Sequence, residues 1–280
     1  MSHAADEITL SLLSGRAERI YFNRLHVFGL LVPHHFRNGS RAFPDSIDPA
    51  GHDCLGDDQV AIACVQRLAR RSPKPVRYSG AMYWYESEVR ELERRLANSV
   101  HEANPPVFYG SSSFGQWDTL AEDFDPRILN LGFGGSTLEA CDYFFDRLVP
   151  PLHPRSLLLY AGDNDLGDGK SADQAFGWFR SLANKAGNLP GSVPFGFVSV
   201  KPSPARFAIV DRIRSLNDMV RAEIESLPAG YYVDVFPAML DRSGSPDRAL
   251  FLEDGLHLNR SGYRLWAQLL EPYRNKIFAG

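Results

Sequence analysis

The stretch Val107-Phe108-Tyr109-Gly110-Ser111-Ser112-Ser113 joins a short apolar run directly to a glycine and three serines. An apolar run of this length next to turn-forming residues is typical of a strand that is buried on both faces of a parallel sheet. Similar apolar runs follow along the chain at residues 128–131, 157–160, 195–200 and 231–235. They predict an α/β protein in which strands and helices alternate from about residue 105 onward.

Helices are expected between these strands, before the first strand and after the last. The pair Ser136 and Glu139 has the spacing of a capping box, which predicts a helix start at Ser136. The apolar residues behind it recur at helical spacing and would form its buried face. Further helices are predicted at residues 83–97, 172–186, 207–226 and 260–274.

Residues 1–100 give a less regular pattern than the rest of the chain. A helix is predicted at residues 59–70, and residues 36–56 are rich in Gly, Pro, Asp and Ser, which indicates a loop. So short a segment would bury a poor core alone. We therefore expect an N-terminal extension, residues 1–100, packed on a main domain of residues 101–280.

Composition excludes several classes of protein. The net charge of −4 offers no basic surface for nucleic acid or anionic lipid. Three cysteines, an odd and sparse set, argue against a disulfide framework and fit a reducing compartment. Polar residues interrupt the most apolar early stretch, and no signal peptide is recognisable. We expect a cytoplasmic protein without membrane insertion, and the sequence leaves homo-oligomerisation open.

Residues that can carry chemistry follow several of the predicted strands, and active sites in parallel sheets form beyond the carboxyl ends of the strands. A hydroxyl in the run Ser111–Ser113 follows the first strand, Gly135 the second and Asn164 the third. Later comes Asp254-Gly255-Leu256-His257, in which the carboxylate can orient the imidazole. Together they supply a nucleophile, oxyanion donors and a base, as acyl transfer requires.

These segments resemble the four sequence blocks of the SGNH/GDSL hydrolases in order and spacing, over roughly residues 105–275. The blocks are Gly110-Ser111-Ser112, Gly132-Phe133-Gly134-Gly135-Ser136-Thr137, Gly162-Asp163-Asn164-Asp165 and Asp254-Gly255-Leu256-His257. The chain departs from the family in the first block, where Ser111 replaces the usual acid and Ser113 replaces the usual Leu. Three consecutive serines are thus candidates, and the family position is that of Ser112.

The resemblance implies a three-layer αβα sandwich, flavodoxin-like, with a five-stranded, mostly parallel sheet. It also implies ester hydrolysis without a metal or other cofactor. Ser112 would attack the ester carbonyl, His257 would take its proton and Asp254 would orient His257. The backbone amides of Ser112 and Gly135 and the side chain of Asn164 would form the oxyanion hole.

The expected partner is a small-molecule ester, with a short acyl group such as an O-acetyl group on a carbohydrate. Aromatic residues near the motifs, Phe114, Trp117 and Phe133, favour this substrate. The same site could serve an acyltransferase, a lysophospholipase or a thioesterase, and the same fold could serve a binding protein without catalysis. Metal-assisted hydrolysis is a further alternative, using ligand-type side chains that have no recognised spacing: His34, His35, His52 and Asp53.

Overall fold

The computed structural model describes residues 80–279, and its core is a five-stranded sheet in which all strands are parallel. The strand order is β2-β1-β3-β4-β5. The strands are β1 (Pro106–Gly110), β2 (Leu129–Gly132), β3 (Ser156–Tyr160), β4 (Phe195–Val198) and β5 (Gly230–Val233). This is the flavodoxin-like order, and it confirms the predicted fold class, with a sheet that is entirely and not mostly parallel.

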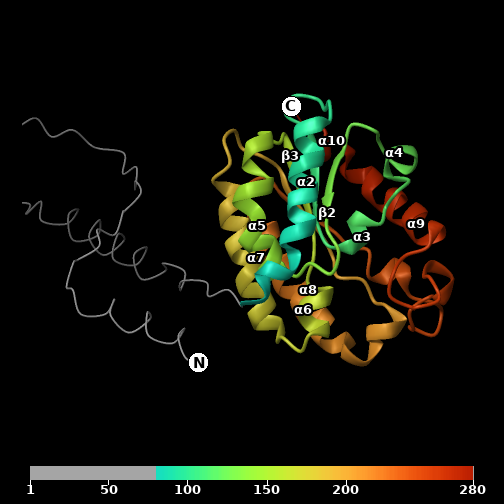
Figure 1. Cartoon of the computed structure of the whole chain (residues 1–280). Coiled ribbons are helices and arrows are strands. Elements are labelled where there is room, and N and C mark those ends of the chain that lie inside the picture. The colour runs from blue at the N-terminus through green and yellow to red at the C-terminus, as the bar shows by residue number, and fades with distance from the viewer. Residues whose placement is uncertain (1–79, 280) are drawn as a thin grey trace, which may run out of the picture. The chain divides into compact units, whose positions relative to one another are not determined.

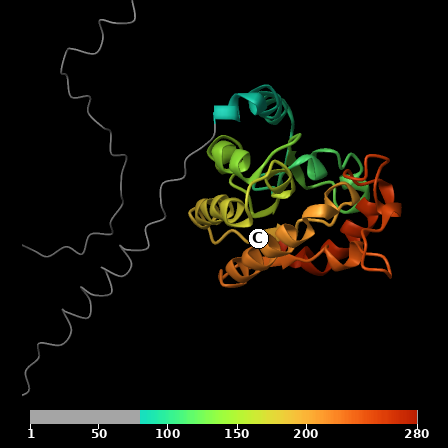
Figure 2. The same ribbon diagram turned by 90° about the horizontal axis from the view of Figure 1, so that it is seen from below.

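Helices cover both faces of the sheet and give the three layers (Figures 1 and 2). The first face carries α2 (Glu86–Asn98), α5 (Leu138–Leu148), α7 (Ala172–Gly187) and α8 (Val210–Glu225). The second face carries α3 (Ser112–Gly115), α4 (Leu120–Asp123), α9 (Arg260–Leu270) and α10 (Arg274–Ile277). A short helix, α6 (Asp163–Gly167), follows β3.

Short 3-10 helices complete the described part of the chain: η1 (Gly80–Tyr85), η2 (Pro150–Leu152), η3 (Pro204–Ile209), η4 (Pro237–Met239), η5 (Arg248–Leu250) and η6 (Glu271–Tyr273).

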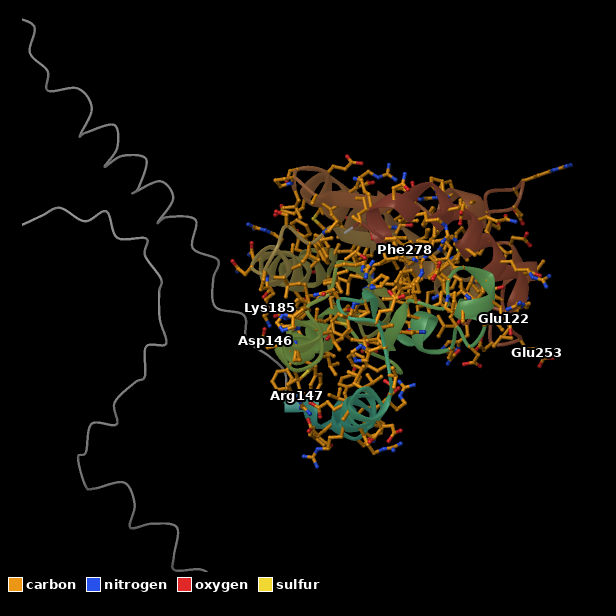
Figure 3. All side chains as sticks on the ribbon, turned by 90° about the horizontal axis from the view of Figure 1, so that it is seen from above. Glu122, Asp146, Arg147, Lys185, Glu253 and Phe278 are labelled. Carbon is orange, nitrogen blue, oxygen red and sulfur yellow. The ribbon has the colours of Figure 1, made fainter. Side chains whose placement is uncertain are left out.

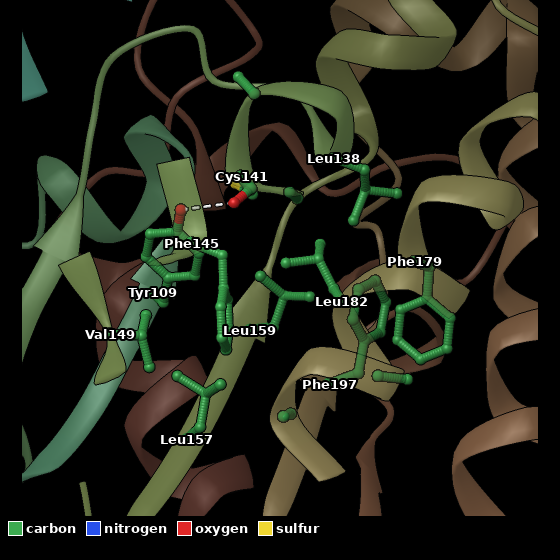
Figure 4. Packing of buried hydrophobic residues seen from close by; sticks show 14 of the residues in the cluster. Tyr109, Leu138, Cys141, Phe145, Val149, Leu157, Leu159, Phe179, Leu182 and Phe197 are labelled. Atoms are coloured by element: carbon green, nitrogen blue, oxygen red, sulfur yellow. Dashed lines mark hydrogen bonds between the residues drawn. The ribbon is translucent and has the colours of Figure 1, made fainter. Parts of the chain in front are cut away.

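Alternation along each strand divides the buried side chains between two hydrophobic cores. On β1, Tyr109 packs into the core under α5 and α7, whereas Phe108 packs into the core under α9. Figure 4 shows the first core, where Leu159 and Phe197 from the sheet meet Leu182 from α7. Both faces of the sheet are therefore apolar, which explains why its strands read as continuous apolar runs.

The start of α5 differs from the sequence prediction by one residue. The N-cap is Thr137, whose hydroxyl accepts a hydrogen bond from Ala140 N at 3.0 Å. The backbone carbonyl of Ser136 accepts a bond from Asn164 Nδ2, and Glu139 is buried. The predicted Ser136–Glu139 capping box is therefore wrong, because the hydroxyl of Thr137 caps the helix and that of Ser136 accepts a bond from Cys141 Sγ instead.

Part of the predicted N-terminal extension is described. Its residues 80–100 include η1 and α2, and α2 places Val89 and Leu92 in the first core. Arg147 of α5, which is labelled in Figure 3, forms ion pairs of 2.8 Å with both Glu86 and Glu93 of α2. The predicted helix 59–70 and loop 36–56 lie outside the described residues, as do His34, His35, His52 and Asp53.

Candidate active site

The turn after β1 places the serine run at the carboxyl end of the sheet. Gly110 has a φ of +140°, and a Cβ at this position would lie 1.9 Å from the carbonyl oxygen of Tyr160. Only glycine fits so close to the neighbouring strand. The chain then turns at once into α3, which begins at Ser112. Because β1 lies between β2 and β3, this turn sits at the topological switch point, where ligands bind in such sheets.

The three serines differ in what surrounds them. Ser111 and Ser113 are buried, whereas Ser112 is partly exposed. The Oγ atom of Ser112 lies 3.4 Å from Nε2 of His257, at the long end of hydrogen-bond range. Ser113 Oγ instead accepts a bond from Lys201 Nζ at 3.2 Å. Of the three hydroxyls, the structure brings that of Ser112 to the histidine.

Asp254 and His257 form a tight local pair. The Nδ1 atom of His257 lies 2.6 Å from Oδ2 of Asp254, while Oδ1 accepts bonds from the backbone amides of Leu256 and His257 at 2.8 and 3.0 Å. The imidazole hydrogen bond, followed by the two amide bonds, lowers the pKa of Asp254 to about 2. An ionised Asp254 keeps the proton on Nδ1, so that the Nε2 lone pair faces Ser112.

The two predicted oxyanion donors besides Ser112 lie in adjacent turns. Gly135 is exposed and has a φ of +65°, in the left-handed region that favours glycine. Asn164 stands in the first turn of α6, after Gly162 with a φ of +115°. Its Nδ2 atom donates to the carbonyl of Ser136 at 3.1 Å, directly after Gly135. The β2–α5 turn and the β3–α6 turn are thus joined at the predicted site.

Arg206 orients Asn164, a relationship that sequence reasoning missed. Its Nη2 atom donates to Oδ1 of Asn164 at 3.1 Å, and Nη1 donates to the backbone carbonyl of Asp163. With Oδ1 occupied by the arginine, the amide NH₂ group of Asn164 is directed toward the loop that holds Gly135. Arg206 lies in η3, far along the chain from the four blocks, and no pattern there marks it.

A buried lysine lies behind the serine run and was also missed. Lys201 Nζ donates to Asp163 Oδ2 at 2.8 Å, to Tyr160 OH at 3.1 Å and to Ser113 Oγ at 3.2 Å. Burial alone would lower the pKa of Lys201, but Asp163 and Tyr160 raise it above its ordinary value. The charged ammonium therefore ties the turns after β1 and β3 together. The sequence feature that could have indicated this role is the position of Lys201, three residues after the buried strand β4.

A pocket of about 370 Å³ opens beside Ser112. Its walls come from α2, α3 and β2 and the turn after it, and they are Glu88, Glu91, Leu92, Arg95, Ser112, Gly115, Gln116, Gly132 and Gly134. The aromatic residues Phe114, Trp117 and Phe133 are buried in the two cores instead. They do not line this pocket, so they give no support to the substrate prediction drawn from them.

Two kinds of feature are absent from residues 80–279. No group of three or more His, Cys, Asp and Glu side chains in this part of the chain could hold a metal ion. None of the helices in it is long and apolar enough to cross a bilayer.

The architecture is that of a flavodoxin-like α/β protein with a serine, a histidine and an aspartate in one hydrogen-bonded chain. The chain belongs to the GDSL-like Lipase/Acylhydrolase family, whose model matches residues 102–265. Membership in this family supports a hydrolase that acts on esters.

Individual relatives agree with this assignment. Platelet-activating factor acetylhydrolase IB subunit alpha1 of Rattus norvegicus is 25% identical over 183 residues, which cover 61% of this chain and 75% of the relative. The Homo sapiens subunit is 26% identical over the same length and the same shares of both chains.

Solved structures share the fold. A GDSL-like lipase from Bacteroides thetaiotaomicron is 24% identical with a TM-score of 0.56, covering 69% of this chain and 96% of its own. A protein from Streptococcus pneumoniae is 18% identical with a TM-score of 0.60, covering 77% of this chain and 99% of its own.

Proposed function

We propose that this protein is a metal-independent serine esterase that cleaves short-chain acyl esters through an acyl-enzyme on Ser112. The observation that carries the proposal is the chain of contacts from Ser112 Oγ to His257 Nε2 and from His257 Nδ1 to Asp254. The pKa of a serine hydroxyl is too high for it to attack as an alkoxide at neutral pH, so it needs a base. A neutral imidazole held by a carboxylate is such a base.

The first half of the reaction forms the acyl-enzyme. Ser112 Oγ attacks the ester carbonyl carbon while His257 Nε2 takes the hydroxyl proton. The carbonyl oxygen becomes an oxyanion, for which the amides of Ser112 and Gly135 and the Asn164 side chain are the proposed donors. The carbon–oxygen bond to the alcohol then breaks, and the leaving alcohol takes its proton from His257.

The second half releases the acid. Water attacks the acyl carbonyl and gives a proton to His257, and the same donors hold the second oxyanion. The bond to Ser112 Oγ breaks, the serine regains its proton from the imidazole, and the carboxylic acid leaves. Asp254 stays ionised throughout and stabilises the imidazolium that forms in each half.

The pocket favours a small, polar ester. Glu88, Glu91 and Arg95 line the same pocket as Ser112, and a long apolar acyl chain bound there would have to desolvate their charged groups. The relatives named as acetylhydrolases point in the same direction. The proposed substrates are therefore acetyl or other short acyl esters of polar alcohols, including O-acetylated carbohydrates.

Nitrophenyl esters of increasing acyl length test both parts of the proposal. Ser112→Ala is expected to lower kcat by about 10³-fold or more, as in serine enzymes that lose their nucleophile. Acetate and butyrate esters should be turned over faster than decanoate and palmitate esters. Undiminished activity in Ser112→Ala would refute the mechanism, and best turnover of the palmitate ester would refute the substrate class.

A further inference from the structure

We propose that Tyr85 and Glu88, which precede the family-matched residues, position the oxyanion glycine Gly135; this role rests on the proposed function. The carboxylate of Glu88 accepts a hydrogen bond from the backbone amide of Gly134 at 2.7 Å. The hydroxyl of Tyr85 donates to the backbone carbonyl of Gly135 at 3.2 Å.

These two bonds hold the peptide groups on either side of the peptide group that carries the Gly135 N–H. The N–H of Gly135 belongs to the peptide group between Gly134 and Gly135. Glu88 fixes the peptide group before it, and Tyr85 fixes the peptide group after it. With both neighbours held, the direction of the Gly135 N–H is set.

The loop needs such support because its own residues supply little. Gly134 and Gly135 are both exposed, and an added Cβ at Gly135 would meet nothing within 4 Å. Glycine also loses more backbone freedom than other residues when it is fixed in one conformation. An oxyanion donor is effective only if its direction is set before the charge develops.

Tyr85 and Glu88 can give this support because α2, which begins directly after Tyr85 and contains Glu88, is well anchored. Val89 and Leu92 of α2 are buried in the first core, and Arg147 binds the helix through Glu86 and Glu93. The Tyr85 ring packs edge-on against Phe133 and Phe144, with centroids 5.8 and 6.5 Å away. Burial raises the pKa of the Tyr85 hydroxyl, so it remains a donor at neutral pH.

Glu88 could also have a second role, in substrate binding, because it lines the pocket beside Ser112. A role in binding alone would change KM, whereas a role in aiming the Gly135 amide would change kcat, because the oxyanion exists only after attack. This difference separates the two roles.

The test compares Glu88→Ala, Glu88→Gln, Tyr85→Phe and the double variant Tyr85→Phe/Glu88→Ala on nitrophenyl acetate. The double variant is expected to lose about 10- to 100-fold in kcat with KM within about threefold, less than deletion of an oxyanion donor. Glu88→Gln keeps an acceptor oxygen and should recover most of the loss of Glu88→Ala. Tyr83→Phe and Glu225→Gln, exposed and away from the loop, are the matched controls.

A trifluoromethyl ketone that forms a tetrahedral adduct supplies a second readout. Its affinity should fall in proportion to kcat/KM across the variants, because the adduct carries the same oxyanion. The positioning role is overturned if kcat and ketone affinity stay at wild-type values, if the loss lies in KM alone, or if Glu88→Gln behaves like Glu88→Ala. A Ser112→Ala enzyme that remains active would instead overturn the proposed function, whatever these variants do.

Discussion

The Oδ2 atom of Asp254 lies 2.6 Å from Nδ1 of His257, three residues later, and its Oδ1 atom accepts two backbone amide bonds from the same turn. One carboxylate thus shapes the turn and orients the imidazole at once. Gly255 makes this arrangement accessible, because its φ of +64° reverses the chain between the two side chains.

Replacing Asp254 with Asn is expected to lower kcat by about 10²- to 10⁴-fold, because the amide NH₂ favours the imidazole tautomer that cannot accept the Ser112 proton. The KM for nitrophenyl acetate should change much less. Steady-state kinetics at pH 8 measure both constants. Glu253→Gln, at the neighbouring exposed position, is the control. An Asp254→Asn enzyme within threefold of wild type would contradict the assigned role of the carboxylate.

The dependence of kcat/KM on pH should show an acid limb with a slope of one. His257 must be neutral to accept the serine proton, so activity is lost as the imidazole is protonated. The lowered pKa of Asp254, about 2, means that this carboxylate stays ionised through the whole limb and adds no second proton. Rates measured from pH 4 to 9 on nitrophenyl acetate check this.

Asp165 is the control for this profile, because burial raises its pKa to about 7. It follows Asn164 and accepts a bond from the amide of Leu138 at 2.8 Å. If His257 causes the acid limb, Asp165→Asn keeps it. Loss of the limb in Asp165→Asn, or a wild-type profile that is flat over the whole measured range, would contradict a histidine base.

Arg206→Lys is expected to reduce kcat by about 10-fold, because a lysine ammonium cannot replace the guanidinium fork that binds Asn164 and the Asp163 carbonyl together. The positive charge near Asp163 is kept, so folding should be little affected. The measurements are kcat, KM and the urea midpoint. Arg214→Lys, an exposed change on α8, should leave all three unchanged. Equal kcat in both variants would show that Arg206 does not set the direction of the Asn164 amide.

Lys201→Met is expected to destabilise the protein by about 3–5 kcal/mol, because it leaves the buried carboxylate of Asp163 without its main partner. The double variant Asp163→Asn/Lys201→Met should recover much of this loss, because it removes both charges. Urea unfolding followed by circular dichroism gives the free energies. Equal stability of Lys201→Met and wild type would mean that the buried pair of Lys201 and Asp163 does not stabilise the turns at the ends of the strands.

The strands and most helices could be predicted from the sequence because both sheet faces are buried. Apolar runs with turn residues at their ends therefore marked all five strands, including β1 and β3. The start of α5 could not be placed, because Ser136 and Thr137 both have cap-forming side chains. In the structure the hydroxyl of Thr137 accepts the amide of Ala140, whereas the hydroxyl of Ser136 accepts a bond from Cys141 Sγ.

Ser112, His257 and Asp254 lie together in the structure, and each belongs to a turn that the sequence marks. The residues that contact the proposed oxyanion donors and the loop around them could not be predicted in the same way. Arg206, Tyr85 and Glu88 form long-range bonds with Asn164, Gly135 and Gly134, which lie 42 to 50 residues away along the chain. Such bonds follow from the packing of η3 and α2 on the domain, and they leave no local pattern in the chain.

In the proposed mechanism, Ser112 carries the acyl group. The most direct measurement is mass spectrometry of the enzyme after reaction with a fluorophosphonate, followed by peptide mapping of the adduct. One adduct per chain is expected, on Ser112, and it should persist in Ser113→Ala and be absent in Ser112→Ala. An adduct on Ser111 or Ser113, or labelling that survives in Ser112→Ala, would contradict the proposed mechanism.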